Sequence, residues 1–185
     1  MKSFLKKLLL AFVVIVAAFV VVVALQPAAF RVERAATIAA APAEVFSQVN
    51  DFHKWEAWSP WAKLDPAAKN SFEGPASGTG AIFKWSGNHE VGKGSMTILE
   101  SRPRELIRIR LDFIKPFKDT STVEFTFKPE GSQTVVTWLM FGENNFISKA
   151  MCLFISIDKM VGGQFEKGLA SIKSIVETAA TSKPE

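Results

Sequence analysis

The most prominent feature of the hydropathy pattern is an unbroken run of 18 apolar residues from Leu8 to Leu25. As a helix, this run spans about 27 Å, close to the hydrocarbon thickness of a bilayer. No polar side chain interrupts it, so none requires a partner in lipid. The pattern predicts a basic tail at 1–7 followed by a transmembrane helix over 8–25.

Three lysines precede the apolar run and predict its orientation. Lysines flanking such a segment stay on the cytoplasmic side. We therefore expect a single-pass protein of the inner (plasma) membrane, with a cytoplasmic N-terminus and a periplasmic or otherwise extracytoplasmic domain. The alternative is a signal peptide whose cleavage leaves the domain secreted. The run exceeds the usual h-region of about 7–15 residues, and Val22 and Ala24 form a poor cleavage site, which favours a retained anchor.

Beyond a linker at 26–30, apolar and polar residues alternate with the period of β-strands. The clearest case is 105–113, where Ile107, Ile109 and Leu111 share one face and charged residues occupy the other. The segment TSTVEFTF repeats the alternation. Further strands are expected at RVERAATI, NSFEG, AIFKWSG, VGKGSMTILES and QTVVTWLMF. Short turns between them favour an antiparallel meander with one face on a core.

Helical periodicity appears twice in the remaining sequence. Two short helices are expected after the first strand, in PAEVFSQVND and FHKWEAWSPW. From about 148 to 180, apolar residues recur at intervals of four, four, three and four: Val161, Phe165, Leu169, Ile172 and Val176. This spacing predicts one long amphipathic helix, broken at Gly162-Gly163. This order of elements predicts a single α+β domain over 31–180, followed by a disordered tail at 181–185.

Charge and composition exclude several classes of function. Three of the four net positive charges belong to residues 1–25, so the remaining 160 residues carry only +1. The basic character therefore follows from the membrane topology and gives no indication of nucleic-acid binding. Cys152 is the only cysteine, which excludes an internal disulfide, and its apolar surroundings suggest a buried thiol.

No pattern typical of a metal or cofactor site is present. The two histidines, His53 and His89, are 36 residues apart and belong to no metal-binding motif. The Gly78–Gly80 pair lacks the third glycine of a dinucleotide fingerprint. We expect no cofactor and no metal.

The order of elements and several of the segments that punctuate it resemble the polyketide cyclase/dehydrase branch of the START/Bet v 1-like (SRPBCC) superfamily. The resemblance covers most of residues 31–175 and rests on RVERAATIAAAPAEVFSQVNDFHKWEAWSPW, GTGAIFKWSGNHEVGKGSMTILES, TVVTWLMFGE and GGQFEKGLASIK. It implies a helix-grip fold: a curved seven-stranded antiparallel sheet around a long C-terminal helix, enclosing a hydrophobic pocket. The superfamily includes lipid carriers, receptors and cyclases, so the resemblance does not assign an activity.

Candidate site residues follow from the expected pocket. The predicted ligand-binding residues are Trp58, Trp85, Glu90, Met96, Trp138 and Phe165. Aromatic residues at the spacing of Trp55, Trp58 and Trp61 more often belong to a core, and we expect at least two of these three to do so. His89 and Glu90 are adjacent and cannot both enter one pocket; Glu90 is the only, weak, catalytic candidate.

These observations leave three hypotheses open. The first is a membrane-tethered module that binds an apolar or lipid-like small molecule in a hydrophobic cavity and contacts the membrane through residues 8–25. The second is a cyclase- or dehydratase-like enzyme acting on an apolar substrate, which requires His89, Glu90 or Asp112 to point into the pocket. The third is a non-catalytic protein of the cell envelope whose surface binds another protein through an exposed apolar patch.

Overall fold

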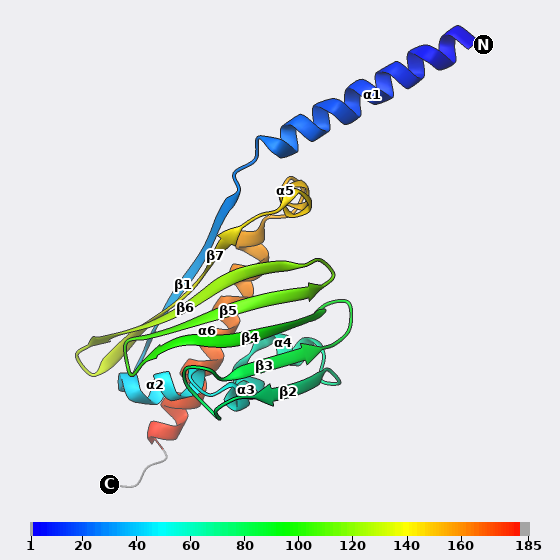
Figure 1. Ribbon diagram of the computed structural model, residues 1–185. Coiled ribbons are helices and arrows are strands. Elements are labelled where there is room, and N and C mark those ends of the chain that lie inside the picture. Colours follow the sequence, from blue (N-terminus) through cyan, green and yellow to red (C-terminus); the bar gives the residue numbers. More distant parts are fainter. Residues whose placement is uncertain (1, 182–185) are drawn as a thin grey trace. The chain divides into compact units, whose positions relative to one another are not determined.

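The computed structural model describes residues 2–181, with side chains from residue 3 onward (Figure 1). The strands are β1 (Ala29–Ile38), β2 (Lys69–Glu73), β3 (Ile82–Ser86), β4 (Lys93–Arg102), β5 (Leu106–Lys115), β6 (Asp119–Glu130) and β7 (Gln133–Glu143). The helices are α1 (Lys2–Ala24), α2 (Pro42–Val49), the 3₁₀ helix η1 (Phe52–Lys54), α3 (Trp55–Trp58), α4 (Pro60–Leu64), α5 (Phe146–Cys152) and α6 (Ile157–Thr181).

The described chain divides into two compact units. One comprises residues 2–30 and 143–156 and contains α1 and α5. The other comprises residues 31–142 and 157–181 and contains the sheet, the short helices and α6. The predicted tail at 181–185 falls outside the described residues, except for Thr181, which ends α6.

The seven strands form one sheet in the order β1-β7-β6-β5-β4-β3-β2. From β2 to β7, consecutive strands pair antiparallel, as short turns between alternating segments predict. The edge strand β1 lies beside β7 in the sheet, and just beyond the end of β1 the buried hydroxyl of Thr134 donates to the carbonyl of Ala40 at 2.7 Å. The predicted seven-stranded helix-grip architecture is confirmed.

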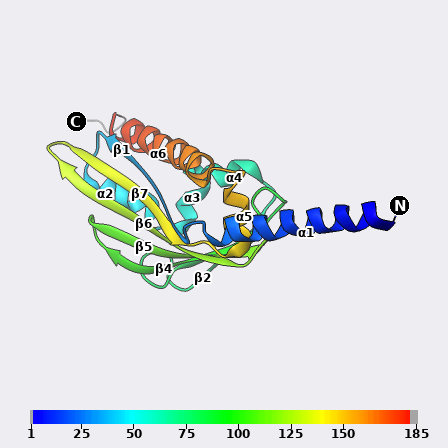
Figure 2. The same cartoon turned by 90° about the horizontal axis from the view of Figure 1, so that it is seen from above.

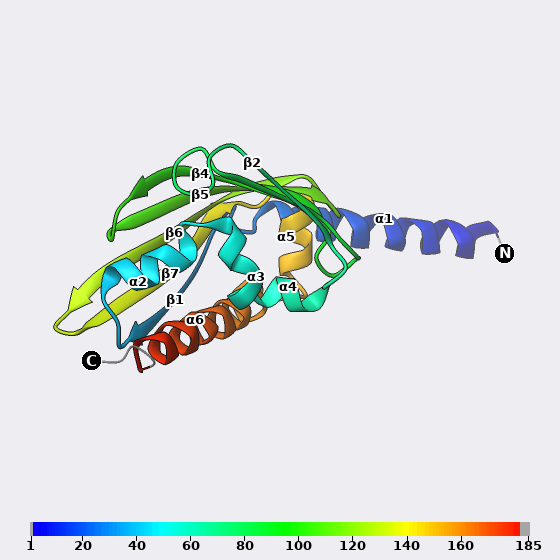
Figure 3. The same ribbon diagram turned by 90° about the horizontal axis from the view of Figure 1, so that it is seen from below.

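The core lies between the inner face of this sheet and α6, with the short helices on the same side (Figures 2 and 3). The alternation seen in the sequence decides which strand residues face it: Val123, Phe125 and Phe127 of β6 are buried. Helix α6 contributes Phe165, Leu169, Ile172 and Val176, spaced along one face of the helix, and it contacts α2, α3 and α4. The predicted packing of a long amphipathic helix against an antiparallel sheet is therefore observed.

The C-terminal helical region differs from the sequence expectation in where it breaks. Helix α5 ends at Cys152 and α6 begins at Ile157, whereas α6 runs without interruption through Gly162 and Gly163. Two glycines lower helix propensity by about 1 kcal/mol each but do not by themselves end a helix. Cys152, expected to be buried, is only half-buried in α5.

Gly162 is retained in α6 because the guanidinium of Arg34 lies across it. A Cβ atom at this position would lie 2.2 Å from Arg34 Nη2. From there Arg34 donates to Asp158 Oδ1 at 2.9 Å and to Glu166 Oε1 at 2.7 Å, so β1 holds the first turns of α6. These hydrogen bonds raise the pKa of Arg34, and the Arg34 partner holds the pKa of Asp158 below its usual range.

Candidate functional site

The inner face of the sheet carries a row of aromatic side chains across β2, β3 and β5. Phe72 lies 5.4 Å from Phe83 between ring centroids, Phe83 lies 5.9 Å from Trp85, and Trp85 lies 6.2 Å from Phe113. The strand register places all four on the face that also carries buried Met96 of β4. We call these four residues the aromatic row. Phe72 is exposed and the other three are half-buried, so the row is an accessible apolar surface.

A glycine on β4 allows this row to be continuous. Gly94 is the cross-strand partner of both Trp85 and Phe113. A Cβ atom at Gly94 would lie 2.5 Å from both the Trp85 ring and the main-chain oxygen of Asp112, so any other residue would displace the indole or the neighbouring strand. The ring is also fixed at its polar end, because Trp85 Nε1 donates to the carbonyl of Val91 at 2.9 Å.

Beside the row lies a fully buried aromatic stack that joins β7 to α6. Trp138 and Phe165 lie nearly parallel, with ring centroids 4.1 Å apart and an interplanar angle of 9°. Trp58, Trp61 and Phe125 contact Trp138 from α3, α4 and β6. Side chains thus occupy the place where an open pocket was expected between Trp138 and α6.

Two buried polar atoms in this interior have no hydrogen-bond partner among the described residues: Ser121 Oγ and Trp138 Nε1. Both residues are 2% exposed. The contrast with the indoles of Trp55 and Trp58 is informative, because each of these donates to a main-chain carbonyl, at 2.9 and 3.0 Å. Buried polar groups in native proteins are normally hydrogen-bonded, and an unsatisfied one costs about 1–3 kcal/mol. These two donors are therefore candidates for contact with a polar atom of a ligand.

The structure brings most of the predicted site residues together. Trp58, Met96, Trp138 and Phe165 are buried in the interior, and Trp85 belongs to the aromatic row. At least two of the tryptophans near residue 58 are core residues, as expected, since Trp55 and Trp58 are both buried. These placements leave their predicted role in ligand binding a prediction.

Glu90 lies apart from this group. The strand expected at VGKGSMTILES begins only at Lys93, as β4, and Glu90 is exposed in the turn between β3 and β4. The side-chain oxygen of Asn88 accepts from the main-chain N–H of Glu90 at 2.8 Å and stabilises this turn. The turn therefore extends past Glu90, and β4 starts after it. Sequence reasoning instead missed Ser121, whose signal was its place in the alternation, on the same face as Val123 and Phe125.

Titratable groups lie outside the interior. His89 is exposed in the same turn as Glu90. Asp112 accepts from Arg110 and from Thr120, both at 2.8 Å, on the outer face of the sheet. On that face Arg108 of β5 also donates to Glu124 of β6 at 2.7 Å, and this hydrogen bond raises the pKa of Arg108. The buried polar residues of the described chain are Ser59, Ser121 and Thr134, none of which titrates near neutral pH.

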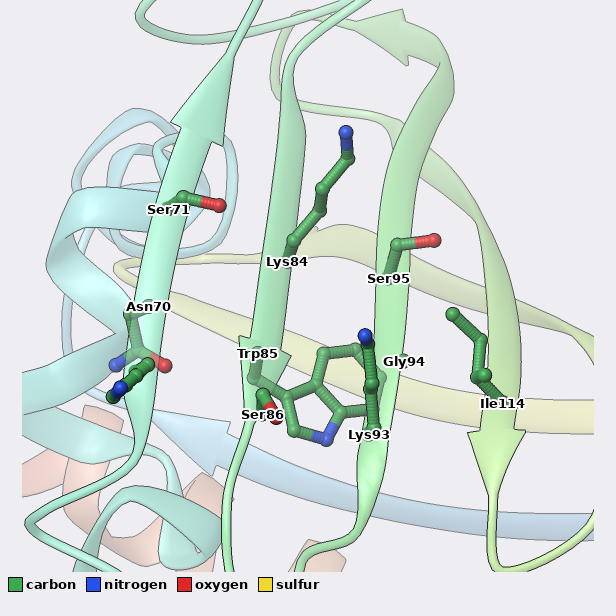
Figure 4. A pocket seen from close by; sticks show the side chains of 10 residues that line it. Asn70, Ser71, Lys84, Trp85, Ser86, Lys93, Gly94, Ser95 and Ile114 are labelled. Carbon is green, nitrogen blue, oxygen red and sulfur yellow. The ribbon is translucent and has the colours of Figure 1, made fainter.

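Two hollows open elsewhere on the sheet-containing unit. The first, about 340 Å³, lies on β2 to β5 and is lined by lysines and serines, including Lys84 and Ser95, and also by Trp85 of the aromatic row (Figure 4). The second, about 170 Å³, lies between α2 and α6. Neither involves the Trp138–Phe165 stack. Within residues 2–181, no group of three His, Cys, Asp or Glu side chains is placed to hold a metal ion.

Helix α1 constitutes a separate feature of the other unit. Residues Ser3–Ala24 form a helix long and apolar enough to cross a membrane, with a mean hydropathy of 3.0. A signal sequence near an N-terminus meets the same criteria. Almost all of this helix is exposed, which distinguishes it from the core helix of a soluble domain.

The sequence profile of a family described as "Polyketide cyclase / dehydrase and lipid transport" matches residues 29–177. The chain belongs to this family. The match covers the sheet, the short helices and nearly all of α6, and it confirms the resemblance inferred from the sequence. No protein of curated function matches the chain.

Solved structures similar to this member of the family show the same fold. Protein CV1439 from Chromobacterium violaceum aligns with a TM-score of 0.58 and 16% identity over 82% of this chain and 99% of its own. The di-domain ARO/CYC StfQ of the steffimycin biosynthetic pathway aligns with a TM-score of 0.60 and 12% identity, over 83% of this chain and 52% of StfQ. Ara h 8.0201 aligns with a TM-score of 0.55 and 12% identity, over 81% and 99% of the two chains. At these identities the likeness establishes the fold alone.

Proposed function

We propose that this protein is a membrane-tethered, non-catalytic module that binds an apolar or lipid-like small molecule against the inner face of its sheet. The observation that carries the proposal is the pair of buried, unpartnered polar atoms, Ser121 Oγ and Trp138 Nε1, in an otherwise apolar and aromatic interior. Sites for small molecules combine such apolar walls with a few polar groups that fix orientation. The family's description, which includes lipid transport, supports the same class of ligand.

The two donors define the chemistry of the ligand. An indole N–H can only donate, and a serine hydroxyl can donate or accept. A ligand that satisfies the Trp138 indole therefore needs an acceptor atom on an apolar body, such as the oxygen of a carbonyl, ester or carboxyl group. Affinity comes mainly from apolar area, at about 25 cal/mol per Å² removed from water.

The aromatic row provides the accessible part of this site, and the Trp138–Phe165 stack closes the deeper part. Phe165 covers one face of Trp138, with ring centroids 4.1 Å apart.

A cyclase or dehydratase is disfavoured because the necessary proton-transfer groups are outside the interior. His89 and Glu90 are exposed in a turn, and Asp112 is engaged on the outer face. General acid–base catalysis requires a titratable group within hydrogen-bond reach of the substrate. A binding module needs no such group.

Native mass spectrometry of the full chain tests the binding proposal. The detergent-solubilised protein is incubated with a total lipid extract, and bound species are identified after the detergent is removed. We expect a stoichiometric apolar species on the wild-type protein. Trp138→Phe keeps the ring and removes the N–H, and Ser121→Ala removes the hydroxyl. Each variant should bind this species about 2- to 10-fold more weakly, the value of one hydrogen bond.

Stability measurements on the same variants separate a ligand contact from a structural role. Removing an unsatisfied buried polar group relieves its desolvation cost, so Ser121→Ala should leave the ligand-free protein as stable as wild type or slightly more stable. Ser95→Ala, on the outer face, is the matched control and should change neither property. The proposal fails if no species is retained, or if all three variants retain it as wild type does.

The tether is tested by the mass and location of the cellular protein. A retained anchor predicts a full-length protein that stays in the membrane fraction after an alkaline wash. A shorter, soluble form that begins near residue 25 would show that the segment is a cleaved signal peptide instead.

A further inference from the structure

A second apolar surface lies in residues 144–156, which we call the α5 segment. It exposes large apolar side chains, among which Phe154 is 80% and Phe146 is 50% exposed. The others are Ile147, Met151 and Ile155. Lys149 is the only charged residue in the segment. A contiguous exposed apolar patch on an otherwise polar surface marks an interaction site.

The exposed side chains of the α5 segment gather on one side of a helical turn. Phe146, Ile147 and Met151 belong to α5, and the chain continues to turn beyond it, because the N–H groups of Phe154 and Ile155 both donate to Met151 O at 3.0 Å. The spacing of these residues is that of one helical face. The segment therefore presents a short apolar ridge, and no part of the proposed ligand site uses it.

The location of the ridge within its unit indicates what covers it. Helix α5 contacts α1 (Figure 1). The N–H of Asn144, at the start of the segment, donates to the carbonyl of Ala28 at 2.7 Å, four residues beyond the end of α1. Val23, near that end of α1, is fully buried, unlike the rest of the helix. The ridge is thus attached beside the C-terminal end of the helix predicted to cross the membrane.

We infer that the α5 segment is a second membrane contact, which inserts its apolar ridge into the interfacial region of the bilayer beside the end of α1. The inference rests on the proposed membrane tether. Helices that lie in the interface place Phe and aliphatic side chains on one face and basic side chains on the other, and by helical spacing Lys149 lies opposite the apolar ridge. The lysine can extend its ammonium group to the lipid headgroups while its methylene chain stays in apolar surroundings. Two contacts with the same bilayer, through α1 and through the ridge, would restrict the orientation of this unit relative to the membrane.

Site-directed spin labelling of the full chain in vesicles of phosphatidylcholine and phosphatidylglycerol tests this inference. The single native thiol is removed with Cys152→Ser, and one nitroxide is attached at a time. Phe154→Cys reports on the ridge, Val14→Cys on the middle of α1, and Ser132→Cys on an exposed turn of the other unit. Power saturation then compares access to oxygen, which concentrates in lipid, with access to a water-soluble nickel chelate.

We expect the label at residue 154 to have an oxygen-to-nickel accessibility ratio several-fold above that of residue 132 and below that of residue 14. A lipid-like ratio at residue 14 with a water-like ratio at residue 154 would overturn the inference and leave the tether intact. Water-like ratios at both positions would overturn the tether and the inference together. A label at residue 154 shielded from both reagents would show that protein, such as a second copy of the chain, covers the ridge, and would also overturn the inference.

Discussion

Phe165 occupies the centre of the interface between α6 and the sheet, and its removal tests whether the interior is packed as described. The ring is 1% exposed and lies 4.1 Å from the ring of Trp138. Truncation of a buried Phe to Ala typically costs about 3–5 kcal/mol, the sum of lost transfer free energy and a residual cavity. For a chain of this size, that cost lowers the melting temperature by about 6–20 °C.

Thermal unfolding of Phe165→Ala and wild type, followed by near-UV circular dichroism in the same detergent, measures this loss. Met160→Ala is the matched control, because Met160 belongs to the same helix but is 56% exposed. A change at this exposed position should stay within about 0.5 kcal/mol. A loss below about 1 kcal/mol for Phe165→Ala would show that the ring is not part of a packed stack.

The same variant makes a second prediction about the space that the ring leaves. Apolar cavities of this kind stay dry and bind small apolar molecules. Benzene should therefore raise the melting temperature of Phe165→Ala in a concentration-dependent way, since it binds the folded state only. It should leave wild type unchanged. If both proteins respond equally, the stack does not fill the space in wild type.

Three further predictions concern single contacts. Gly162→Ala places a methyl group 2.2 Å from Arg34 and should be less stable than its neighbour Gly163→Ala. At Gly163 nothing lies within 4 Å of the added methyl group, and the higher helix propensity of Ala stabilises the helix by up to about 1 kcal/mol. Equal stabilities of the two variants in chemical denaturation would contradict the Arg34 contact. Gly94→Ala crowds the indole above it and should cost about 1–3 kcal/mol and alter tryptophan fluorescence; an unchanged spectrum would contradict this packing. The pKa of Asp158 is lowered by its Arg34 partner, so its contribution to stability is complete above pH about 3.9 and is lost as pH falls through the lower folded-state pKa. Asp158→Asn should remove this part of the acid dependence; an unchanged acid profile would refute the assignment.

Much of the fold could be predicted because it depends on local patterns. Strand alternation such as that of β5 and β6 decides which side chains face the core, and the structure reproduces it. The break between α5 and α6 could not be predicted in this way. No Gly or Pro marks residues 153–156, and the glycines that suggested a break at 162–163 are instead accommodated by Arg34 from a distant strand.

The candidate site was only partly predictable for a similar reason. The burial of Trp58, Met96, Trp138 and Phe165 was predictable, because large apolar residues at the period of a strand or helix face the core, whereas their role in ligand binding stays a prediction. Which polar atoms remain without a partner depends on what every neighbouring group does. The indole N–H groups of Trp55 and Trp58 donate to main-chain carbonyls, whereas that of Trp138 has no partner among the described residues. Because all three residues are tryptophan, the sequence does not predict this difference.

By itself, the sequence determined the class of the protein: an apolar N-terminal helix, seven alternating strands and a long amphipathic helix, and a net charge that gives no indication of nucleic-acid binding. These properties depend on composition and on periods of a few residues. Only the tertiary structure decided that the interior is filled by the Trp138–Phe165 stack, that Ser121 and Trp138 carry unpaired donors, and that residues 144–156 lie beside α1. Each of these features depends on contacts between residues far apart in the chain. Such contacts arise from tertiary packing and cannot be predicted from the local sequence pattern.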